Sequence, residues 1–221
     1  IIMLSSLIAY LNVFHTNTSS DELSKYKNII EFIPTNRGKI TDLNIIIESN
    51  ELVKVIKDFC NKQRVSQFIV SLSGGVDSMV LTAILKFLGF RVICLHINYN
   101  NRDESPLEQQ FLEEWCLKED IILYTKVIDT IKRGTIKRST YELESKNIRF
   151  GFYKEILEQE KCTMILLGHH KDDIVENVVA NVCRGRNLLD LAVIKEQTTQ
   201  NNITIARPML EFYKITIYDF A

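Results

Sequence analysis

Short apolar runs that alternate with helical patterns constrain the fold of this 221-residue chain more than any other feature. The runs are apolar almost throughout rather than at every second position, which is typical of strands buried on both faces of a sheet. Such strands, separated by helices, form parallel sheets with right-handed crossover connections. The sequence therefore predicts an α/β fold, namely a doubly wound, Rossmann-like parallel sheet of five core strands with helices on both faces. The expected strands are Phe68–Leu72, Arg91–Ile97, Ile121–Val127, Thr163–Leu167 and Ile203–Ala206.

Helices and one loop connect these strands. The first expected helix begins at Glu51, and the others cover Val76–Leu88, Pro106–Leu117, Tyr141–Gln159 and Asp172–Cys183. A polar surface loop is expected before the last strand, at Glu196–Asn202. Residues 51–221 are therefore expected to form one α/β domain.

The first 50 residues are expected to be an N-terminal extension, and no chemistry is evident in them. Their pattern predicts a helix at Asp21–Phe32, a turn at Pro34–Gly38 and a β-prone run at Leu43–Glu48. The chain begins at Ile1 and stops at Ala221 inside a helical pattern, which is compatible with a piece of a longer polypeptide.

Composition excludes some classes of function. The 27 basic and 28 acidic residues leave a formal net charge of −1, which argues against binding nucleic acid through overall charge. RNA would need a local basic patch. The best candidate is the loop Lys132–Arg138, with Arg184 and Arg186 as additions, and a merely solvated charged loop is the alternative. The apolar opening, Ile1–Phe14, is too short to cross a bilayer, so no membrane partner is expected.

The cysteines indicate the redox compartment. All five lie outside CxxC pairs and zinc-like spacings, and an odd number suits reduced thiols. We therefore expect a cytoplasmic protein.

The strongest functional signal is the hexapeptide Ser73–Ser78, Ser-Gly-Gly-Val-Asp-Ser, between the first expected strand and the next helix. Gly74 and Gly75 let the backbone approach an anion, the helix start offers N–H groups, and the two serines add hydroxyl donors. Asp77 would repel phosphate unless a cation lies between them, which favours Mg²⁺ at this carboxylate. The alternative is an ordinary strand-to-helix turn capped by serine.

A second signal, Gly168–Asn177, follows the fourth expected strand, where ligands of doubly wound sheets bind. Glu176 lies four residues beyond Asp172 and three beyond Asp173, so these carboxylates and the histidines at positions 169 and 170 are expected to converge. A substrate-binding role is preferred. The alternatives are aspartates that only cap the helix and histidines that bind zinc.

The hexapeptide resembles the PP-loop of ATP pyrophosphatases, which cleave ATP between the α- and β-phosphates. Downstream segments resemble, in the same order, motifs of the tRNA(Ile)-lysidine synthetase family, and the similarity spans Gln67–Ala221. The matching segments are Leu95–Ser105 with Glu108, Phe111 and Cys116, Tyr141-Glu142 with Arg149-Phe150, Gly168–Glu176, Arg184-Gly185 and Ala206–Leu210. The resemblance implies an adenine nucleotide alpha hydrolase-like fold and a PP-loop ATP pyrophosphatase domain over residues 51–221.

The same resemblance implies a reaction. ATP would adenylate the 2-oxo oxygen of the wobble cytidine in an isoleucine tRNA, releasing pyrophosphate, and the ε-amine of free lysine would then displace AMP from the ring. The implied cofactors are ATP and Mg²⁺. The implied partners are the anticodon loop of the tRNA and free lysine, and a homodimer is compatible with the sequence.

Site residues follow from the motifs that match. The expected catalytic residues are Asp77, which would also bind the metal, Asp172, Asp173, Glu176 and Arg149. The expected nucleotide-binding residues are Ser73, Gly74, Gly75, Val76, Asp77, Ser78, His96, Gly168, His169 and Arg207. For His96 the alternative is a satisfied core histidine, and for Arg149 and Arg207 it is a surface or salt-bridged arginine.

Three other functions remain open on the sequence. A PP-loop tRNA thiolase would use paired cysteines, often around an iron–sulfur cluster, and no such pair occurs. An amidating synthetase would need a glutaminase or ammonia-channel partner domain, which is not evident. A nucleotide-binding module without catalysis would bind ATP and release no pyrophosphate.

Overall fold

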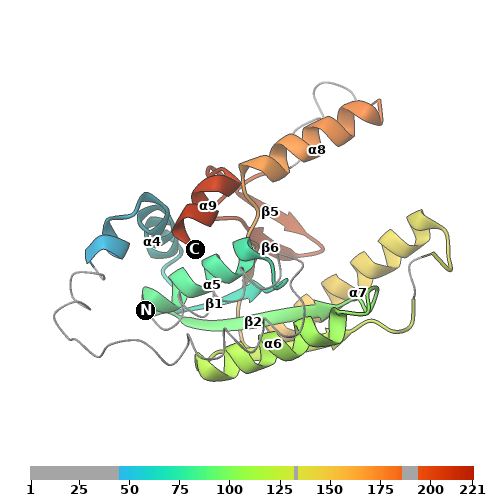
Figure 1. Ribbon diagram of the computed structural model, residues 1–221, viewed down its shortest axis with the longest axis horizontal. Coiled ribbons are helices and arrows are strands. Elements are labelled where there is room, and N and C mark those ends of the chain that lie inside the picture. The colour runs from blue at the N-terminus through green and yellow to red at the C-terminus, as the bar shows by residue number, and fades with distance from the viewer. Residues whose placement is uncertain (1–44, 132–133, 186–193) are drawn as a thin grey trace, which may run out of the picture.

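A six-stranded sheet forms the centre of the molecule (Figure 1). The computed structural model describes residues 45–131, 134–185 and 194–221. The strand order is β3-β2-β1-β4-β6-β5, and only β5 runs antiparallel to its neighbour. The strands are β1 (Gln67–Ser71), β2 (Arg91–Asn98), β3 (Ile122–Val127), β4 (Met164–Leu166), β5 (Gln197–Gln200) and β6 (Ile203–Ala206).

Helices cover both faces of the sheet, as the apolar strands predict. The labelled helices are α4 (Glu51–Gln63), α5 (Val76–Phe87), α6 (Ser105–Lys118), α7 (Arg138–Gln159), α8 (Lys171–Cys183) and α9 (Lys214–Phe220). Residues of α4, α5, α6 and α9 share one core cluster with one face of β1, whereas α7 packs with the other face in a second cluster. The doubly wound fold is therefore confirmed. Among the helices of the described residues, none is long and apolar enough to span a membrane.

The order of the strands fixes where a ligand can bind. The chain builds outward from β1 through β2 to β3 and then crosses to the opposite side of β1, where β4 and β6 pair. The sheet therefore has a topological switch point between β1 and β4. Connections leave in opposite directions there, which opens a crevice beyond the carboxyl ends of these two strands.

Two helices extend beyond the sheet. Figure 1 shows α8 and the first part of α7 projecting from the same side of the molecule. Exposed apolar side chains accompany this projection. Val175, Val179 and Val182 of α8 are 54%, 55% and 55% exposed, and Leu143 of α7 is 59% exposed.

The polar segment before the last strand is an edge strand rather than a surface loop. Residues Gln197 to Gln200 pair antiparallel with β6, and Asn201 and Asn202 form the turn with φ of 51° and 62°. Asparagine tolerates this left-handed conformation, which suits a two-residue hairpin turn. The sequence misses β5 because an edge strand needs few apolar residues. The prediction of five strands is corrected to six.

The β-prone run at Leu43–Glu48 is also corrected. Residues 45–49 are helical, with Ile47 only 7% exposed in the core and Ile45 and Ile46 63% and 62% exposed. One isoleucine that faces inward, next to two that face outward, fits one helical turn on the core better than a buried strand. The predicted helix at Asp21–Phe32 and the turn at Pro34–Gly38 lie outside the described residues.

Replacing Ile47 tests whether this turn packs on the core. Ile47→Ala removes buried methyl groups and should lower the free energy of unfolding by about 2 kcal/mol or more, measured by urea denaturation. Ile46→Ala changes the same side chain type at an exposed position, so its effect should stay within about 0.5 kcal/mol. Equal effects of the two substitutions would contradict the packing.

Candidate active site

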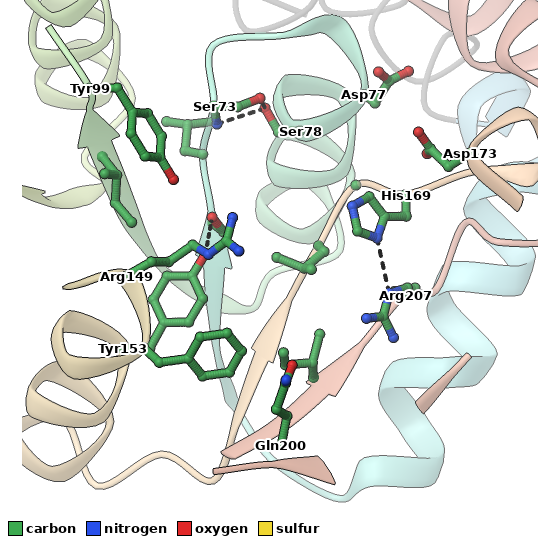
Figure 2. Close-up of a pocket in the computed structure, with 17 residues that line it drawn as sticks. Ser73, Asp77, Ser78, Tyr99, Arg149, Tyr153, His169, Asp173, Gln200 and Arg207 are labelled. Atoms are coloured by element: carbon green, nitrogen blue, oxygen red, sulfur yellow. Dashed lines mark hydrogen bonds between the residues drawn. The ribbon is translucent and has the colours of Figure 1, made fainter. Parts of the chain in front are cut away.

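A cavity of about 400 Å³ lies beyond the carboxyl ends of β1 and β4, at the switch point (Figure 2). Its walls come from the segments that follow β1, β2 and β4, from α7, and from the β5–β6 hairpin. Its lining includes Ser71, Leu72, Ser73, Asp77 and Ser78 from β1 to α5, Ile97 and Tyr99 at the end of β2, Arg149, Phe150 and Tyr153 of α7, Leu167, Gly168, His169 and Asp173 after β4, and Gln200, Ile205 and Arg207 of the last hairpin and its end.

The Ser73–Ser78 turn holds itself in shape through its own serines. The Ser78 hydroxyl donates to the Gly75 carbonyl at 3.0 Å and accepts from the Ser73 amide at 3.1 Å, while the Ser73 hydroxyl accepts from the Gly75 amide at 3.2 Å. Gly74 has a φ of 84°, a conformation that favours glycine. No side chain caps α5, so the N–H groups of its first turn are available to a ligand. This is the geometry of an anion-binding turn.

Gly168 lets β4 end directly against that turn. A Cβ atom on Gly168 would lie 2.8 Å from the Ser78 nitrogen and 2.9 Å from the Asp77 carbonyl carbon. Both are backbone atoms, so they cannot move aside as the end of a flexible side chain would. Glycine at this position sets the distance between the two motifs that the sequence singles out.

Asp77 lies among polar groups that only partly satisfy it. Its Oδ2 is 3.7 Å from the Nε2 of His170, whereas its Oδ1 is buried without a hydrogen-bond partner within the described residues. Burial raises the pKa of Asp77, and the nearby His170 and Lys214 oppose that rise. A cation at Oδ1 would compensate the carboxylate for its lost hydration.

These observations fit Mg²⁺. The ion commonly binds through one or two carboxylates together with phosphate oxygens of a substrate. Asp77 supplies one such carboxylate beside the anion-binding turn. Within the described residues there is no group of three or more histidine, cysteine or acidic side chains arranged to bind a metal. The remaining ligands would therefore come from the nucleotide and water.

The aspartates at the start of α8 act partly as structural acceptors. The Asp173 Oδ2 accepts from the His170 amide at 2.8 Å, and the Asp172 Oδ2 accepts from the Lys214 amide at 2.7 Å. Asp173 also lines the cavity, but Asp172 does not. One oxygen of Asp173 therefore caps the start of α8, as the helix-capping alternative expects. Asp172 instead links α8 to α9.

His169 and Arg207 form a directed pair on one wall of the cavity. The Arg207 Nε donates to the His169 Nδ1 at 3.0 Å. The Arg207 Nη1 donates to the Lys195 carbonyl at 2.8 Å and to the Thr198 hydroxyl at 3.1 Å. Burial lowers the pKa of His169, as does the charge of Arg207, against the opposing effect of Asp173.

The opposite wall comes from α7. Figure 2 shows Arg149 and Tyr153 across the cavity from His169 and Arg207. The Tyr153 hydroxyl lies 2.7 Å from the Ser71 hydroxyl, and burial raises the pKa of Tyr153. Arg149 stands over the Phe150 ring at 5.9 Å from its centroid. Arg149 also lines the cavity, together with Tyr153.

Some residues expected at the site lie elsewhere. His96 is 5% exposed on the other face of the sheet, with its Nδ1 2.9 Å from the Leu72 carbonyl oxygen, as the core-histidine alternative expects. Glu176 is exposed on α8 and does not line the cavity. In the basic loop, Lys132 and Arg133 lie outside the described residues, as does Arg186, whereas Arg138 pairs with Glu142 at 2.7 Å.

Sequence reasoning missed several lining residues, and three of them are polar and lie outside every matched motif. Tyr153 lies four positions after Arg149, so the period of a helix places both on one face and could have found it. Ser71 is the last residue of β1 and carries no motif. Gln200 belongs to β5, the strand that the sequence does not indicate.

The fold and the site together define a doubly wound α/β protein with a glycine-containing turn, an uncapped helix N-terminus and a carboxylate at the switch point of its sheet. The family comparison agrees with this class. The model of the PP-loop domain family matches residues 48–221, and the chain belongs to that family. The resemblance inferred from the motifs is thereby confirmed.

Related proteins carry a more specific name. The chain is 29% identical over 157 residues to the tRNA(Ile)-lysidine synthase of Enterococcus faecalis, and 32% identical over 156 residues to that of Francisella tularensis subsp. holarctica. These alignments cover 69% and 71% of the chain but only 33% and 38% of the two relatives. The chain therefore spans little more than a third of their length.

Solved structures share the fold. A U34-tRNA thiolase from Methanococcus maripaludis has a TM-score of 0.61 at 17% identity, with 77% of this chain and 62% of that chain covered. An NH3-dependent NAD synthetase from Campylobacter jejuni has a TM-score of 0.51 at 14% identity, with 80% and 72% covered. At these identities the likeness concerns the fold alone.

Replacing Gly168 tests the close approach of β4 to the turn. Gly168→Ala should lower the free energy of unfolding by about 1–3 kcal/mol, because the new methyl group meets backbone. The control is Gly151→Ala on α7, where nothing lies within 4 Å of the added Cβ. There alanine should stabilise the helix by about 0.5–1 kcal/mol. Urea denaturation measures both, and a Gly168→Ala protein as stable as the parent would contradict the geometry.

The buried His96 predicts a dependence of stability on pH. Burial lowers the pKa of His96 in the folded state, so the imidazole binds a proton more readily in the unfolded chain than in the folded protein. Protonation of His96 therefore does not lower the free energy of unfolding above the unfolded pKa of about 6.5, and it lowers that free energy as the pH drops below this value. Urea midpoints between pH 8 and 5.5 measure the loss.

His96→Gln is the matched variant for that experiment. Glutamine keeps an N–H donor for the Leu72 carbonyl and does not titrate. The decrease in midpoint on acidification should be smaller in this variant than in the parent. The comparison separates His96 from His169 and Asp77, which both proteins retain. Parallel curves would show that His96 titrates alike in the folded and unfolded chains.

Proposed function

We propose that this protein is an ATP-dependent ligase that attaches lysine to the wobble cytidine of an isoleucine tRNA through an adenylated cytosine. The observation that carries the proposal is the Ser73–Ser78 turn, which leads into the uncapped helix α5 at one end of a cavity. Within this turn the Asp77 Oδ1 has no hydrogen-bond partner among the described residues. The tRNA(Ile)-lysidine synthases that the chain resembles support the choice of reaction. In the proposal, residues 51–221 form the catalytic domain and residues 1–50 an extension.

The turn holds the β- and γ-phosphates in this proposal. The N–H groups at the start of α5 and the hydroxyl group of Ser73 donate to them, Gly74 and Gly75 leave room for their approach, and the Ser78 hydroxyl holds the turn in shape through the Gly75 carbonyl. Asp77 binds Mg²⁺, which offsets phosphate charge when it is present. The α-phosphate then points toward the centre of the cavity, between Arg149 and His169.

The first chemical step joins two substrates. The 2-oxo oxygen of cytosine attacks the α-phosphorus of ATP, and the bond to the β-phosphate oxygen breaks, so pyrophosphate leaves. Arg149 stabilises the charge that develops on the α-phosphate and on the base. His169 donates a hydrogen bond to the same phosphate from the other wall.

The second step forms the carbon–nitrogen bond. The neutral ε-amine of lysine attacks the ring carbon that carries the activated oxygen, and AMP leaves with the electron pair of the broken C–O bond. A carboxylate at the start of α8 orients the ammonium group and accepts its proton. Among Asp172, Asp173 and Glu176, the proposal favours Asp173, because it lines the cavity and keeps one oxygen free of the His170 amide.

The tRNA approaches between the projecting parts of α7 and α8 in this proposal. Arg184 is exposed at the end of α8, and Lys137 is exposed at the start of α7. Contacts from such residues position an RNA backbone without reading its sequence.

The cysteines agree with a reducing compartment. None of the five forms a disulfide, which suits the cytoplasm where tRNA is modified; they are Cys60, Cys94, Cys116, Cys162 and Cys183.

Labelled lysine tests the reaction. The protein is incubated with ATP, Mg²⁺, labelled lysine and isoleucine tRNA that carries a wobble cytidine, and label is measured in the RNA together with pyrophosphate. Asp77→Asn should reduce both signals on the order of 100-fold, since it removes the charge that binds the cation. The control Asp58→Asn changes an exposed aspartate of α4 and should leave both unchanged.

The outcomes separate the competing functions. Label in the RNA that depends on ATP supports the ligase. Tight ATP binding without pyrophosphate release would replace it with a binding module. An iron–sulfur absorbance band, with sulfur rather than lysine transferred, would replace it with a thiolase.

A further inference from the structure

We propose that Arg207 is a positioning residue that fixes the tautomer of His169, so that a neutral imidazole presents its Nε2–H group to the ligand. This deepens the proposed function, on which the identity of the ligand rests. Sequence reasoning expects Arg207 itself to contact phosphate. The structure instead points its Nε–H at a histidine that lines the cavity.

The hydrogen bond itself defines the tautomer. A guanidinium group has five N–H donors, no acceptor, and stays protonated throughout the range in which proteins are stable. Because the Arg207 Nε donates at 3.0 Å, the His169 Nδ1 must offer its lone pair. A neutral imidazole then carries its only proton on Nε2. Figure 2 shows this second nitrogen turned away from Arg207, toward the side of the cavity with Ser73 and Ser78.

The arginine is held so that it cannot easily turn away. Its Nη1 donates to the Lys195 carbonyl and the Thr198 hydroxyl, at 2.8 and 3.1 Å, and the residue is only 9% exposed. Its own amide also donates to the Glu196 carbonyl at 2.8 Å. The start of the last hairpin therefore clamps Arg207, and Arg207 in turn holds His169. This gives the β5–β6 hairpin a function at the site.

Charge reinforces the neutral state of His169. A second ring proton would sit on Nδ1 and face the Nε–H group of Arg207, which would replace a hydrogen bond with two opposed donors. The charged groups that influence His169 are Arg207 after β6, Arg149 on α7, His170 and Asp173. Only Asp173 favours the charged form, and burial outweighs it.

The consequence concerns which atoms the site can recognise. A neutral histidine that is clamped at Nδ1 can only donate at Nε2. The group opposite must therefore be an acceptor, and in the proposed reaction it is an oxygen of the α-phosphate. Because the donor is oriented before the ligand arrives, little reorganisation is needed on binding.

Nitrogen NMR of the ring nitrogens tests the tautomer directly. The protein, labelled with ¹⁵N at histidine, is recorded at pH 7.5, and two-bond ¹H–¹⁵N correlations show which nitrogen carries the proton. His169→Gln assigns the signal. The expected result is a neutral Nε2–H tautomer for His169. An Nδ1–H tautomer or a charged ring at this pH would overturn the proposal.

The protein supplies an internal control. The His96 Nδ1 lies 2.9 Å from the Leu72 carbonyl oxygen, which only accepts, so His96 should show the opposite Nδ1–H tautomer. Arg207→Met should convert the His169 signal to a mixture of tautomers that becomes protonated at a higher pH, while the His96 signal stays unchanged. A His169 signal that is the same in Arg207→Met and the parent would overturn the role of Arg207.

ATP binding then connects the tautomer to the ligand. Arg207→Met should weaken ATP binding about tenfold, as loss of an orienting partner commonly does. His169→Gln keeps an N–H donor without tautomers, so in that background the Arg207→Met effect should shrink. An undiminished effect would show that Arg207 contacts the nucleotide itself. The tautomer measurement needs no substrate, so it stands even if the lysine reaction is absent.

Discussion

The contact between Gly168 and the first turn of α5 is the constraint on which the rest of the site depends. It brings the carboxyl end of β4 within van der Waals distance of the backbone of Asp77 and Ser78. Everything that follows Gly168 in the chain is thereby placed relative to the anion-binding turn. His169 enters the cavity, His170 lies against the Asp77 carboxylate, and Asp173 follows at the start of α8.

The strand order explains why so short a contact can organise the whole cavity. β1 and β4 are neighbours in the sheet, so the loops that leave their carboxyl ends start side by side and then diverge toward opposite edges of the sheet. Two loops that diverge from adjacent strands enclose a space without any special lid. The walls are then supplied by α7 from one face and by the end of the last hairpin from the other side.

The sequence predicts the parts of this structure that repeat a strong local pattern. Apolar runs such as Phe68–Leu72 and the Ser73–Ser78 turn are read correctly because burial on both faces and a glycine-rich turn leave clear signals. The edge strand β5 leaves none, since Gln-Thr-Thr-Gln needs only one paired side. His96 shows a second limit, because a motif gives a residue's position in the chain but not the face of the strand on which its side chain lies.

Hydrogen-bond partners lie further still from what a sequence can give. Arg207 follows a strand that the sequence predicts, and an arginine near a phosphate-binding turn is naturally expected to contact phosphate. Its actual partners are His169, on a different loop, and two groups of the segment before β6. These contacts arise from tertiary packing, and His169 lies 38 residues before Arg207 in the chain. No local pattern encodes them.

Burial acts on the ionisable groups of the cavity in a common direction. It raises the pKa of Asp77 and Tyr153 and lowers that of His169, so each group is moved toward its neutral form. Arg149 and Arg207 keep their positive charge because guanidinium does not lose its proton under ordinary conditions. These two arginines place fixed positive charges at the lining, although the chain as a whole carries a net charge of −1. A polyanionic ligand would meet fixed cations and hydrogen-bond donors there. The overall charge of a protein is thus a poor guide to the ligand of a buried site, because the few residues that line the site set its local charge.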